Sequence, residues 1–529
     1  MSISKLQTNL EARRNLLKLG TCGAMTNATF LSTLMHLKMT NTLMSAPVIA
    51  PPSDYKAMVC LFFNGAIDSF NVLTPHGTTQ GDAQFADYVA TRGGAALQRD
   101  PASSVFNDTS GGSGATYGYL KPIVSKVSGQ ADRTFGLHPR FVNLKNMYDA
   151  GHATFVANCG ALYEPILNKT EYSRTTAPVR KKPLGLFSHS DQQRHWQTAV
   201  PQSKNQANGW AAKMLDLFVD PMLSASNNIY TAVSTAGQSI LLTGDQITPF
   251  AIGGITTNPP TNGGATQLGG FSQTATTSVD KIYTAMQNDY ASQLYADVLE
   301  KTIRDNRKDA RDGAALFQTT FLNTSIGNGF PTSSAGPGLA SVAKVIKMAK
   351  TANANPTGSP LEQKRQIFLV QVGGWDHHAN LLGNQNSMIK GIDDALQAFY
   401  QFLITEQLLS KVTLFSISDF SRTLSFNGSG TDHAWGANTI VMGGAVNATA
   451  GNNRVWGTYP DIRLDSAGSG IDLGRGVLIP QTSSDVYHAE ICRWFGVANS
   501  DSELKLVLPN IRNFYSAGAA SPIPFLNAP

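Results

Sequence analysis

Long uninterrupted apolar runs mark the strands expected in this sequence of 529 residues. The first run covers residues 55–63 (YKAMVCLFF) and stops at Asn64-Gly65, where the chain turns polar. A strand that is buried on both faces has this pattern, because neither face of its sheet meets water. Further strands are predicted at 153–158, 367–372, 412–418 and 440–444.

Helical periodicity lies between these runs. Residues 139–150 and 278–318 repeat apolar side chains at helical spacing. Helices predicted at 339–352 and 388–408 each precede a strand. This alternation predicts an α/β fold with a mostly parallel central sheet and helices on both faces.

Stretches rich in Gly, Ser and Thr interrupt this pattern. Residues 80–120, 255–277 and 330–338 hold few regularly spaced apolar side chains, which predicts loops. We therefore expect one large domain at 51–529, with long insertions around 80–120 and 200–360.

The N-terminal segment, residues 1–50, has the pattern of an export signal. Arg13-Arg14 is followed by Leu16-Leu17-Lys18, which resembles a twin-arginine signal. The alternative is a soluble amphipathic arm with a chance arginine pair. Export would make the twin-arginine machinery a partner and the protein periplasmic or extracellular. The sequence holds no run of about 18 uncharged apolar residues, so we expect no transmembrane segment in the mature chain.

Composition narrows the function classes. Hydrophobic residues make up 42% and charged residues 15%, which excludes wholesale disorder. The net charge is +5, but residues 1–46 contribute +4 of it, so the remainder gives no electrostatic case for nucleic acid. Four cysteines exclude a disulfide scaffold, and Cys60, Cys159 and Cys492 are expected to be buried.

Polar side chains that can bind a metal or take part in catalysis follow the predicted strands. In an open α/β sheet the carboxyl ends of the strands share one edge, where sites form. Five of the ten histidines lie in these segments. The candidate residues are Asp68, Asn71, Ser188, His189, His195, Asp376, His377, His378, Asp419, Arg422 and His433.

Carboxylates and imidazoles from different strands form a ligand set for a divalent metal. Such an ion can activate water or a serine, and a serine beside a histidine offers a nucleophile. Each residue alone also has a structural explanation: Asp68 could brace a turn, Asp376 could cap a helix, and Asp419 could pair with Arg422. The conjunction favours a functional site.

Several segments together carry a family resemblance, which spans most of residues 55–500. They are the twin-arginine start, NGAIDSFN (64–71), LHPRFVNLKNMYDAG (137–151), SHSDQQ (188–193), GGWDHHAN (373–380), SDFSRT (418–423), TDHAWG (431–436), VMGG (441–444) and YHAEICRWFGV (487–497). The set resembles the secreted bacterial family of domain of unknown function 1501. That family is in turn similar to the alkaline phosphatase and sulfatase superfamily.

The resemblance implies an alkaline-phosphatase-like fold and a divalent metal, Zn, Mn or Ca. Asp376, His378 and His433 would form one metal site. Asp419 would belong to a second, with Asp68 as a further ligand. By the same resemblance Ser188, or less favourably Ser190, is the nucleophile beside His189. An anionic substrate group would lie near Arg422, Asn71 and His377.

The sequence departs from the superfamily at two places. The first strand usually ends in an acid, but Asn64 stands there, and the usual Asp-His motif is Asp419-Phe420. The leading hypothesis is an exported metal-dependent hydrolase of phosphate or sulfate esters. The alternative is a non-catalytic envelope protein whose degenerate metal site binds a glycan or a surface partner. A metal-free serine esterase is disfavoured, because no G-x-S-x-G motif surrounds Ser188.

Overall fold

The computed structural model divides the chain into two units, and the larger one comprises residues 46–265 and 317–529. The residues described are 49–50, 52–77, 85–100, 118–127, 131–218, 230–255, 285, 288–289, 292, 298–327, 329–359, 361–449, 451–464 and 470–527. The segment predicted as an export signal, 1–50, lies almost entirely outside them. The fold and the site below belong to the larger unit.

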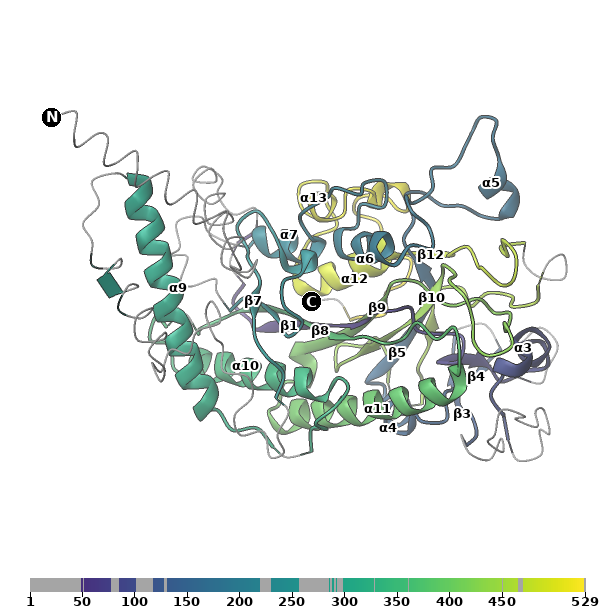
Figure 1. Cartoon of the computed structure of the whole chain (residues 1–529), viewed down its shortest axis with the longest axis horizontal. Coiled ribbons are helices and arrows are strands. Elements are labelled where there is room, and N and C mark those ends of the chain that lie inside the picture. Colours follow the sequence, from purple (N-terminus) through teal and green to yellow (C-terminus); the bar gives the residue numbers. More distant parts are fainter. Residues whose placement is uncertain are drawn as a thin grey trace. The chain divides into compact units, whose positions relative to one another are not determined.

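A nine-stranded sheet forms the centre of this unit, in the order β11-β5-β10-β9-β1-β8-β6-β7, with β12 paired to β5 (Figure 1). Strand β10 runs antiparallel to both of its neighbours, and every other pairing in this sheet is parallel. The predicted α/β fold with a mostly parallel sheet is therefore confirmed. The strands are β1 (Lys56–Phe63), β5 (Ala153–Gly160), β6 (Ala232–Ser234), β7 (Phe250–Ala251), β8 (Arg365–Val372), β9 (Val412–Ser418), β10 (Ala437–Met442), β11 (Val455–Trp456) and β12 (Thr482–Ser483).

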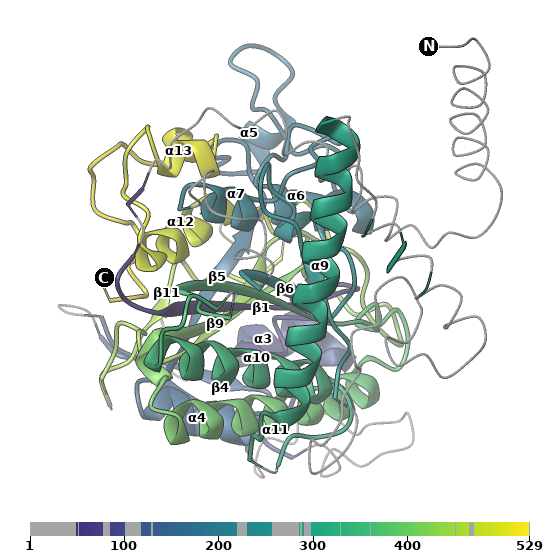
Figure 2. The same cartoon turned by 90° about the vertical axis from the view of Figure 1, so that its left-hand side faces the viewer.

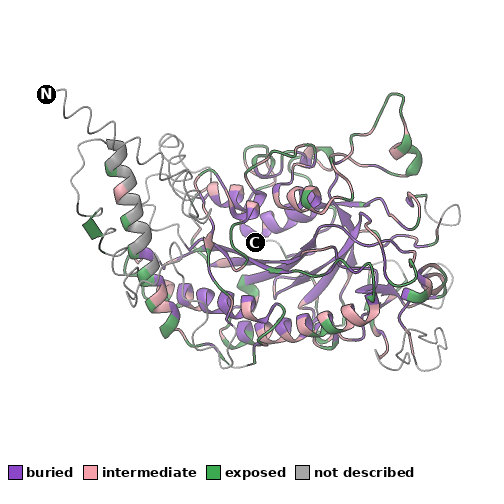
Figure 3. Ribbon diagram, in the orientation of Figure 1, coloured by how far each residue is buried: buried purple, intermediate pink, exposed green. Residues whose placement is uncertain are grey.

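Helices cover both faces of the sheet. Figures 1 and 2 show α4, α10 and α11 on one face and α6, α7, α12 and α13 on the other. They span α4 (Val142–Asp149), α10 (Gly336–Ala354), α11 (Leu381–Thr405), α6 (His189–Thr198), α7 (Trp210–Asp216), α12 (Ser484–Phe495) and α13 (Leu504–Val507). Alternate residues of β1 enter two separate apolar cores, since Val59 and Leu61 pack in one and Met58 and Cys60 in the other. Both cores are almost wholly buried (Figure 3).

The register of the central strands places their ends level. Phe63 of β1 lies opposite Val372 of β8 and Ser418 of β9. The chain therefore leaves all three strands at one edge, just before the polar segments that begin at Asn64, Gly373 and Asp419. This alignment creates the site.

The prediction of a loop over residues 80–120 is wrong for part of that stretch. Helix α3 (Phe85–Arg92) and a 3₁₀ turn (Gly93–Ala95) lie there. Phe85, Tyr88 and Arg92 are buried at helical spacing, and two of the three are aromatic. A small antiparallel sheet accompanies this helix, formed by β2 (Leu73–Pro75), β4 (Arg133–Leu137) and β3 (Lys121–Ser125).

Other boundaries shift modestly. Helix α10 begins three residues before the predicted start, because Pro337 occupies its first turn, where a missing N–H costs nothing. Helix α9 (Val298–Asn323) covers the end of the stretch predicted at 278–318, most of whose first part lies outside the described residues. Short helical segments complete this list: α5 (Lys169–Ser173), Ile240–Leu242, Leu409–Lys411 and Ile511–Asn513.

Two expectations from composition concern membrane spans and cysteines. In the described part of the chain, no helix combines the length and apolarity that a bilayer crossing requires. Cys60, Cys159 and Cys492 are buried and free, as expected.

Candidate metal centre

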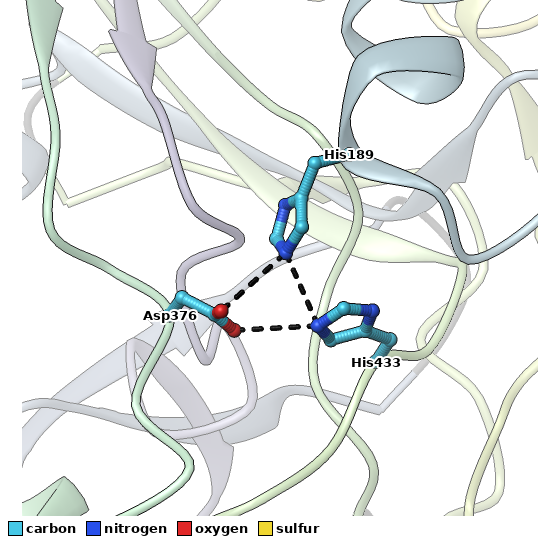
Figure 4. A group of neighbouring side chains, drawn as sticks. All are labelled: His189, Asp376 and His433. Atoms are coloured by element: carbon cyan, nitrogen blue, oxygen red, sulfur yellow. Dashed lines mark hydrogen bonds and ion pairs between the residues drawn. The ribbon is translucent and has the colours of Figure 1, made fainter.

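Three imidazoles and one carboxylate converge beyond the carboxyl ends of β8 and β9. Asp376 and His378 follow β8, His433 lies between β9 and β10, and His189 is the first residue of α6. One ligand atom each from His189, Asp376 and His433 lie within 4.8 Å of one another (Figure 4). These side chains come from three distant parts of the sequence, and the sheet brings them together.

The spacing of these atoms suits a bound ion. His433 Nε2 lies 3.1 Å from His189 Nε2 and 3.2 Å from His378 Nε2. Asp376 Oδ1 lies 3.0 Å from His378 Nε2 and 3.4 Å from His433 Nε2, and its Oδ2 lies 3.6 Å from His189 Nε2. A tetrahedral ion with metal–ligand bonds of about 2.0–2.1 Å holds its ligand atoms roughly 3.3–3.4 Å apart. The observed distances scatter around that value.

Each imidazole has its other nitrogen bonded to an oxygen acceptor. An oxygen acceptor fixes Nδ1 as the protonated nitrogen and leaves Nε2 with a free lone pair. The Nε2 lone pairs of His189 and His378 then each face His433 Nε2 and the Asp376 carboxylate, an arrangement that repels itself unless a metal ion or a further proton lies between these atoms. The Nδ1 acceptors are Asp419 Oδ2 for His189 (2.6 Å), Asp432 Oδ1 for His378 (3.1 Å) and the Phe187 carbonyl for His433 (2.9 Å).

Asp419 orients the ring of His189 by accepting a hydrogen bond from its Nδ1. Its Oδ2 also accepts hydrogen bonds from Gln193 Nε2 at 3.1 Å and from the backbone N–H of Gly65 at 3.2 Å. Its side chain is fully buried, and burial raises its pKa although these hydrogen bonds oppose that shift. The family resemblance implies that Asp419 belongs to a second metal site, whereas in the structure its carboxylate contacts His189.

Gly65 lets two strand ends approach closely. Its φ is +110°, and a Cβ there would stand 2.9 Å from the backbone nitrogens of Trp375 and Asp376. A larger residue would separate the turn after β1 from the turn after β8. The glycine therefore sets the position of Asp376. Asp376 is not a helix cap, because Asn380 holds the N-cap position of α11.

Arg422 forms an ion pair with Asp376 and not, as the sequence alone allowed, with Asp419. The buried guanidinium donates to Asp376 Oδ1, to the carbonyl oxygen of Thr431 and, at 3.4 Å, to Thr431 Oγ1. Burial raises the pKa of Asp376, but the hydrogen bond and charge of Arg422 outweigh it and lower the pKa overall. An isolated antiparallel bridge also joins Arg422 to His433 and fixes the two segments together.

The predicted residues Asp68, Asn71 and His377 lie outside the converging group. Asp68 forms a fully buried ion pair with Arg92, whose guanidinium also donates to the carbonyl of Thr423 at 2.9 Å. Asn71 is buried, donates to the carbonyl of Ala95 at 2.9 Å and accepts from Tyr88 Oη at 2.8 Å. His377 is buried, and burial lowers its pKa.

Ser188 precedes His189 directly at the N-cap of α6. Its Oγ lies 3.3 Å from Ser190 Oγ, and Ser188 is partly exposed while Ser190 is exposed. His195, also in α6, is buried and donates from Nε2 to the Leu184 carbonyl at 2.7 Å. The first turn of α6 therefore carries both His189 and a hydroxyl group at the edge of the site.

Three residues that contact the centre, and Arg92 outside it, had no role predicted from the sequence. Gln193 lies one helical turn after His189, a spacing that signals a shared helix face. Asp432 precedes His433 directly and holds His378. Phe420 packs its ring 4.8 Å from both His189 and His433, and Arg92 gave no signal because it lies in the stretch expected to be loop.

Residues 359–461 match the family model described as "Protein of unknown function (DUF1501)". This match confirms the predicted family resemblance over that stretch, which holds Asp376, His378, Asp419 and His433. No curated protein matches the chain.

Two solved structures show a weak similarity. One is the lipoteichoic acid synthase LtaP from Listeria monocytogenes, with 9% identity, coverage of 84% of this chain and 80% of that one, and a TM-score of 0.26. The other is alkaline phosphatase from the Antarctic bacterium TAB5, with 11% identity, coverage of 75% and 91%, and a TM-score of 0.23. Similarity at this level says nothing about the chemistry of this chain.

Proposed function

We propose that this protein is an exported, metal-dependent hydrolase of phosphate or sulfate esters. One observation carries the proposal: ligand atoms of His189, Asp376 and His433 lie within 4.8 Å of one another, while both imidazoles have Nδ1 bonded to oxygen. Export rests on the Arg13-Arg14 motif, and a periplasmic or extracellular location is part of the proposal.

The ligand set favours zinc over manganese and calcium. Imidazole nitrogens suit Zn²⁺, whereas Mn²⁺ prefers carboxylate, carbonyl and water oxygens and Ca²⁺ takes six to eight oxygen ligands. His189, His433 and Asp376 would hold the ion, and three protein ligands leave a coordination position open for a substrate oxygen. Bound there, it supplies Lewis-acid stabilisation of charge on an ester oxygen.

The chain's own residues would prepare an anionic ester for attack. Arg422 keeps Asp376 ionised and in place, and Asp419 and Gln193 orient His189. The N-terminus of the ten-residue helix α6 carries a partial positive charge that attracts a phosphate or sulfate group. Ser188 Oγ is the proposed nucleophile: it would attack phosphorus or sulfur, lose its proton to water, and displace the alcohol as the ester P–O or S–O bond breaks.

Metal content is the first test. We expect about one ion per chain by elemental analysis of the purified protein, and its loss in Asp376→Ala/His433→Ala. The control is Asp394→Ala/His152→Ala, in which an exposed acid and a partly buried histidine are removed from elsewhere in the fold. A metal-free wild type would overturn the proposal.

Ester cleavage is the second test. Metal-loaded wild type should hydrolyse an aryl phosphate or an aryl sulfate, and Ser188→Ala should lose that activity while keeping its metal. Metal binding with no cleavage of either ester would contradict the hydrolase proposal.

A non-catalytic envelope protein is the second candidate, and two observations favour it. Phe420 fills the space beside His189 and His433, and Arg92 neutralises Asp68, so neither position offers a ligand for a second ion. If the protein has this role, a bound ion should stabilise its fold and it should cleave neither ester. It should also bind a glycan or a surface protein.

A further inference from the structure

The loop that joins β5 to α6, residues 161–187, combines basic side chains with exposed apolar ones. Figures 1 and 2 show that it carries α5 and extends beyond α6 and α7. It ends directly at the metal centre, because the Phe187 carbonyl accepts the hydrogen bond from His433. We call residues 161–187 the α5 loop.

Basic side chains dominate the α5 loop. It holds five basic and two acidic residues, a net charge of +3, whereas residues 47–529 as a whole carry only +1. Arg180 engages both acids, at 3.5 Å from Glu164 and 3.3 Å from Glu171. Among the described residues, no ion pair within 4 Å involves the other four cations, which are Lys169, Arg174, Lys181 and Lys182. The ammonium groups of Lys181 and Lys182 lie over the rings of Tyr163 and Tyr172.

Apolar side chains are exposed on the same loop. Ten large hydrophobic side chains are exposed in the described part of the chain, and four of them belong here. Single exposed hydrophobic residues need no explanation, but four of the ten fall within this one loop, which also carries the basic side chains. These four are Leu167 (64% exposed), Val179 (50%), Leu184 (42%) and Phe187 (36%).

We infer that the α5 loop docks the protein onto an anionic phospholipid bilayer. Lys169, Arg174, Lys181 and Lys182 contact lipid phosphates, and the exposed apolar side chains enter the headgroup–acyl boundary. A soluble polyanion would use the charges but would leave Leu167 and Val179 in water, so the combination favours a membrane. This inference does not rest on the proposed ester hydrolysis.

Vesicle sedimentation of the full chain tests the inference. The protein should sediment with vesicles of equal parts phosphatidylcholine and phosphatidylglycerol, weakly with pure phosphatidylcholine, and less as salt rises. Lys181→Gln/Lys182→Gln should weaken binding about 30-fold, since each basic residue near such a surface contributes a change of about five- to sixfold. Leu167→Ser/Val179→Ser should weaken it about tenfold.

The matched control is Ile404→Ser/Lys411→Gln. Ile404 is an exposed apolar residue in the last turn of α11, on the opposite face of the sheet, and Lys411 is an exposed basic residue in the 3₁₀ turn that follows this helix. This control should sediment like wild type, and all variants should keep the wild-type metal content. No binding to phosphatidylglycerol vesicles, or equal loss in the control, would overturn the inference. Binding that polyphosphate abolishes, and that Leu167→Ser/Val179→Ser leaves unchanged, would overturn it in favour of a soluble polyanion.

Discussion

Asp419 holds His189 by a hydrogen bond of 2.6 Å from Nδ1, which turns Nε2 of the same ring toward His433. A buried carboxylate behind a histidine fixes its tautomer and raises its basicity as a ligand. Asp419 is thus a positioning residue in this arrangement, and its effect on the ion passes through His189.

The first prediction concerns this pair. Asp419→Asn keeps the shape of the side chain but removes its charge, so metal affinity should fall about 10- to 100-fold. Competition with a chromogenic chelator measures the change, and Asp394→Asn on the exposed face of α11 is the control. Unchanged affinity in Asp419→Asn would remove the positioning role.

The second prediction concerns the buried ion pair of Arg92 and Asp68, in which both side chains are fully buried. Arg92→Met leaves the Asp68 carboxylate unpaired in the interior and should cost about 3–5 kcal/mol of unfolding free energy. Arg92→Met/Asp68→Asn removes both charges and should cost less than the single change. Urea unfolding measures each variant.

The control for this cycle is the exposed pair of Arg463 and Asp461. Arg463→Met should leave the unfolding free energy almost unchanged, because water screens both partners. A double variant at Arg92 and Asp68 that is no more stable than Arg92→Met would show that the lost arginine contacts, and not the unpaired charge, set the cost.

The third prediction concerns pH. Asp485 in α12 is fully buried, and neither of its carboxylate oxygens has a hydrogen-bond partner among the described residues. Burial raises its pKa well above the usual value, so the folded protein favours the protonated acid. The stability that this group contributes is present below its unfolded pKa of about 4 and is lost as pH rises toward the folded value.

Asp485→Asn mimics the protonated acid and should escape this loss. The unfolding free energy of the variant minus that of wild type should increase by about 1.4 kcal/mol for each pH unit above about 4. The increase should stop at the pKa that Asp485 has in the folded protein. Urea unfolding with a chelator present, at about pH 5 and about pH 7, measures this difference. The exposed Asp501→Asn should show no such increase, since Arg512 lowers the pKa of Asp501. A constant difference for Asp485→Asn would contradict the prediction.

Much of this architecture was predictable because strands buried on both faces leave a strong pattern. The runs at β1, β8 and β9 were evident, and the rule that sites lie beyond strand ends directed attention to Asp376, Asp419 and His433. Antiparallel β10 was not predictable in direction, because a buried antiparallel strand has the same apolar run as a parallel one.

The partners of these residues were harder to predict. Hydrogen bonds such as Asp432 to His378, or Arg422 to Asp376 instead of Asp419, depend on loop geometry over a few ångströms. Phe420 was recognised as a departure from the Asp-His motif, but only the fold shows that its ring packs on two imidazoles. Arg92 was missed because the glycines around it conceal a short helix.

The last prediction ranks two histidines of the centre. His433 Nε2 lies within 3.2 Å of both other imidazole nitrogens, whereas the described contacts of His378 Nε2 are with Asp376 and His433. His378 is also the most exposed of the three, at 47% of its side chain. His378→Ala leaves His189, Asp376 and His433, enough for three-ligand binding with an open position. Its metal stoichiometry should persist with weaker affinity, while His433→Ala should lose stoichiometric binding. Elemental analysis after dialysis against a weak chelator separates the two, and equal loss in both variants would make His378 an obligatory ligand.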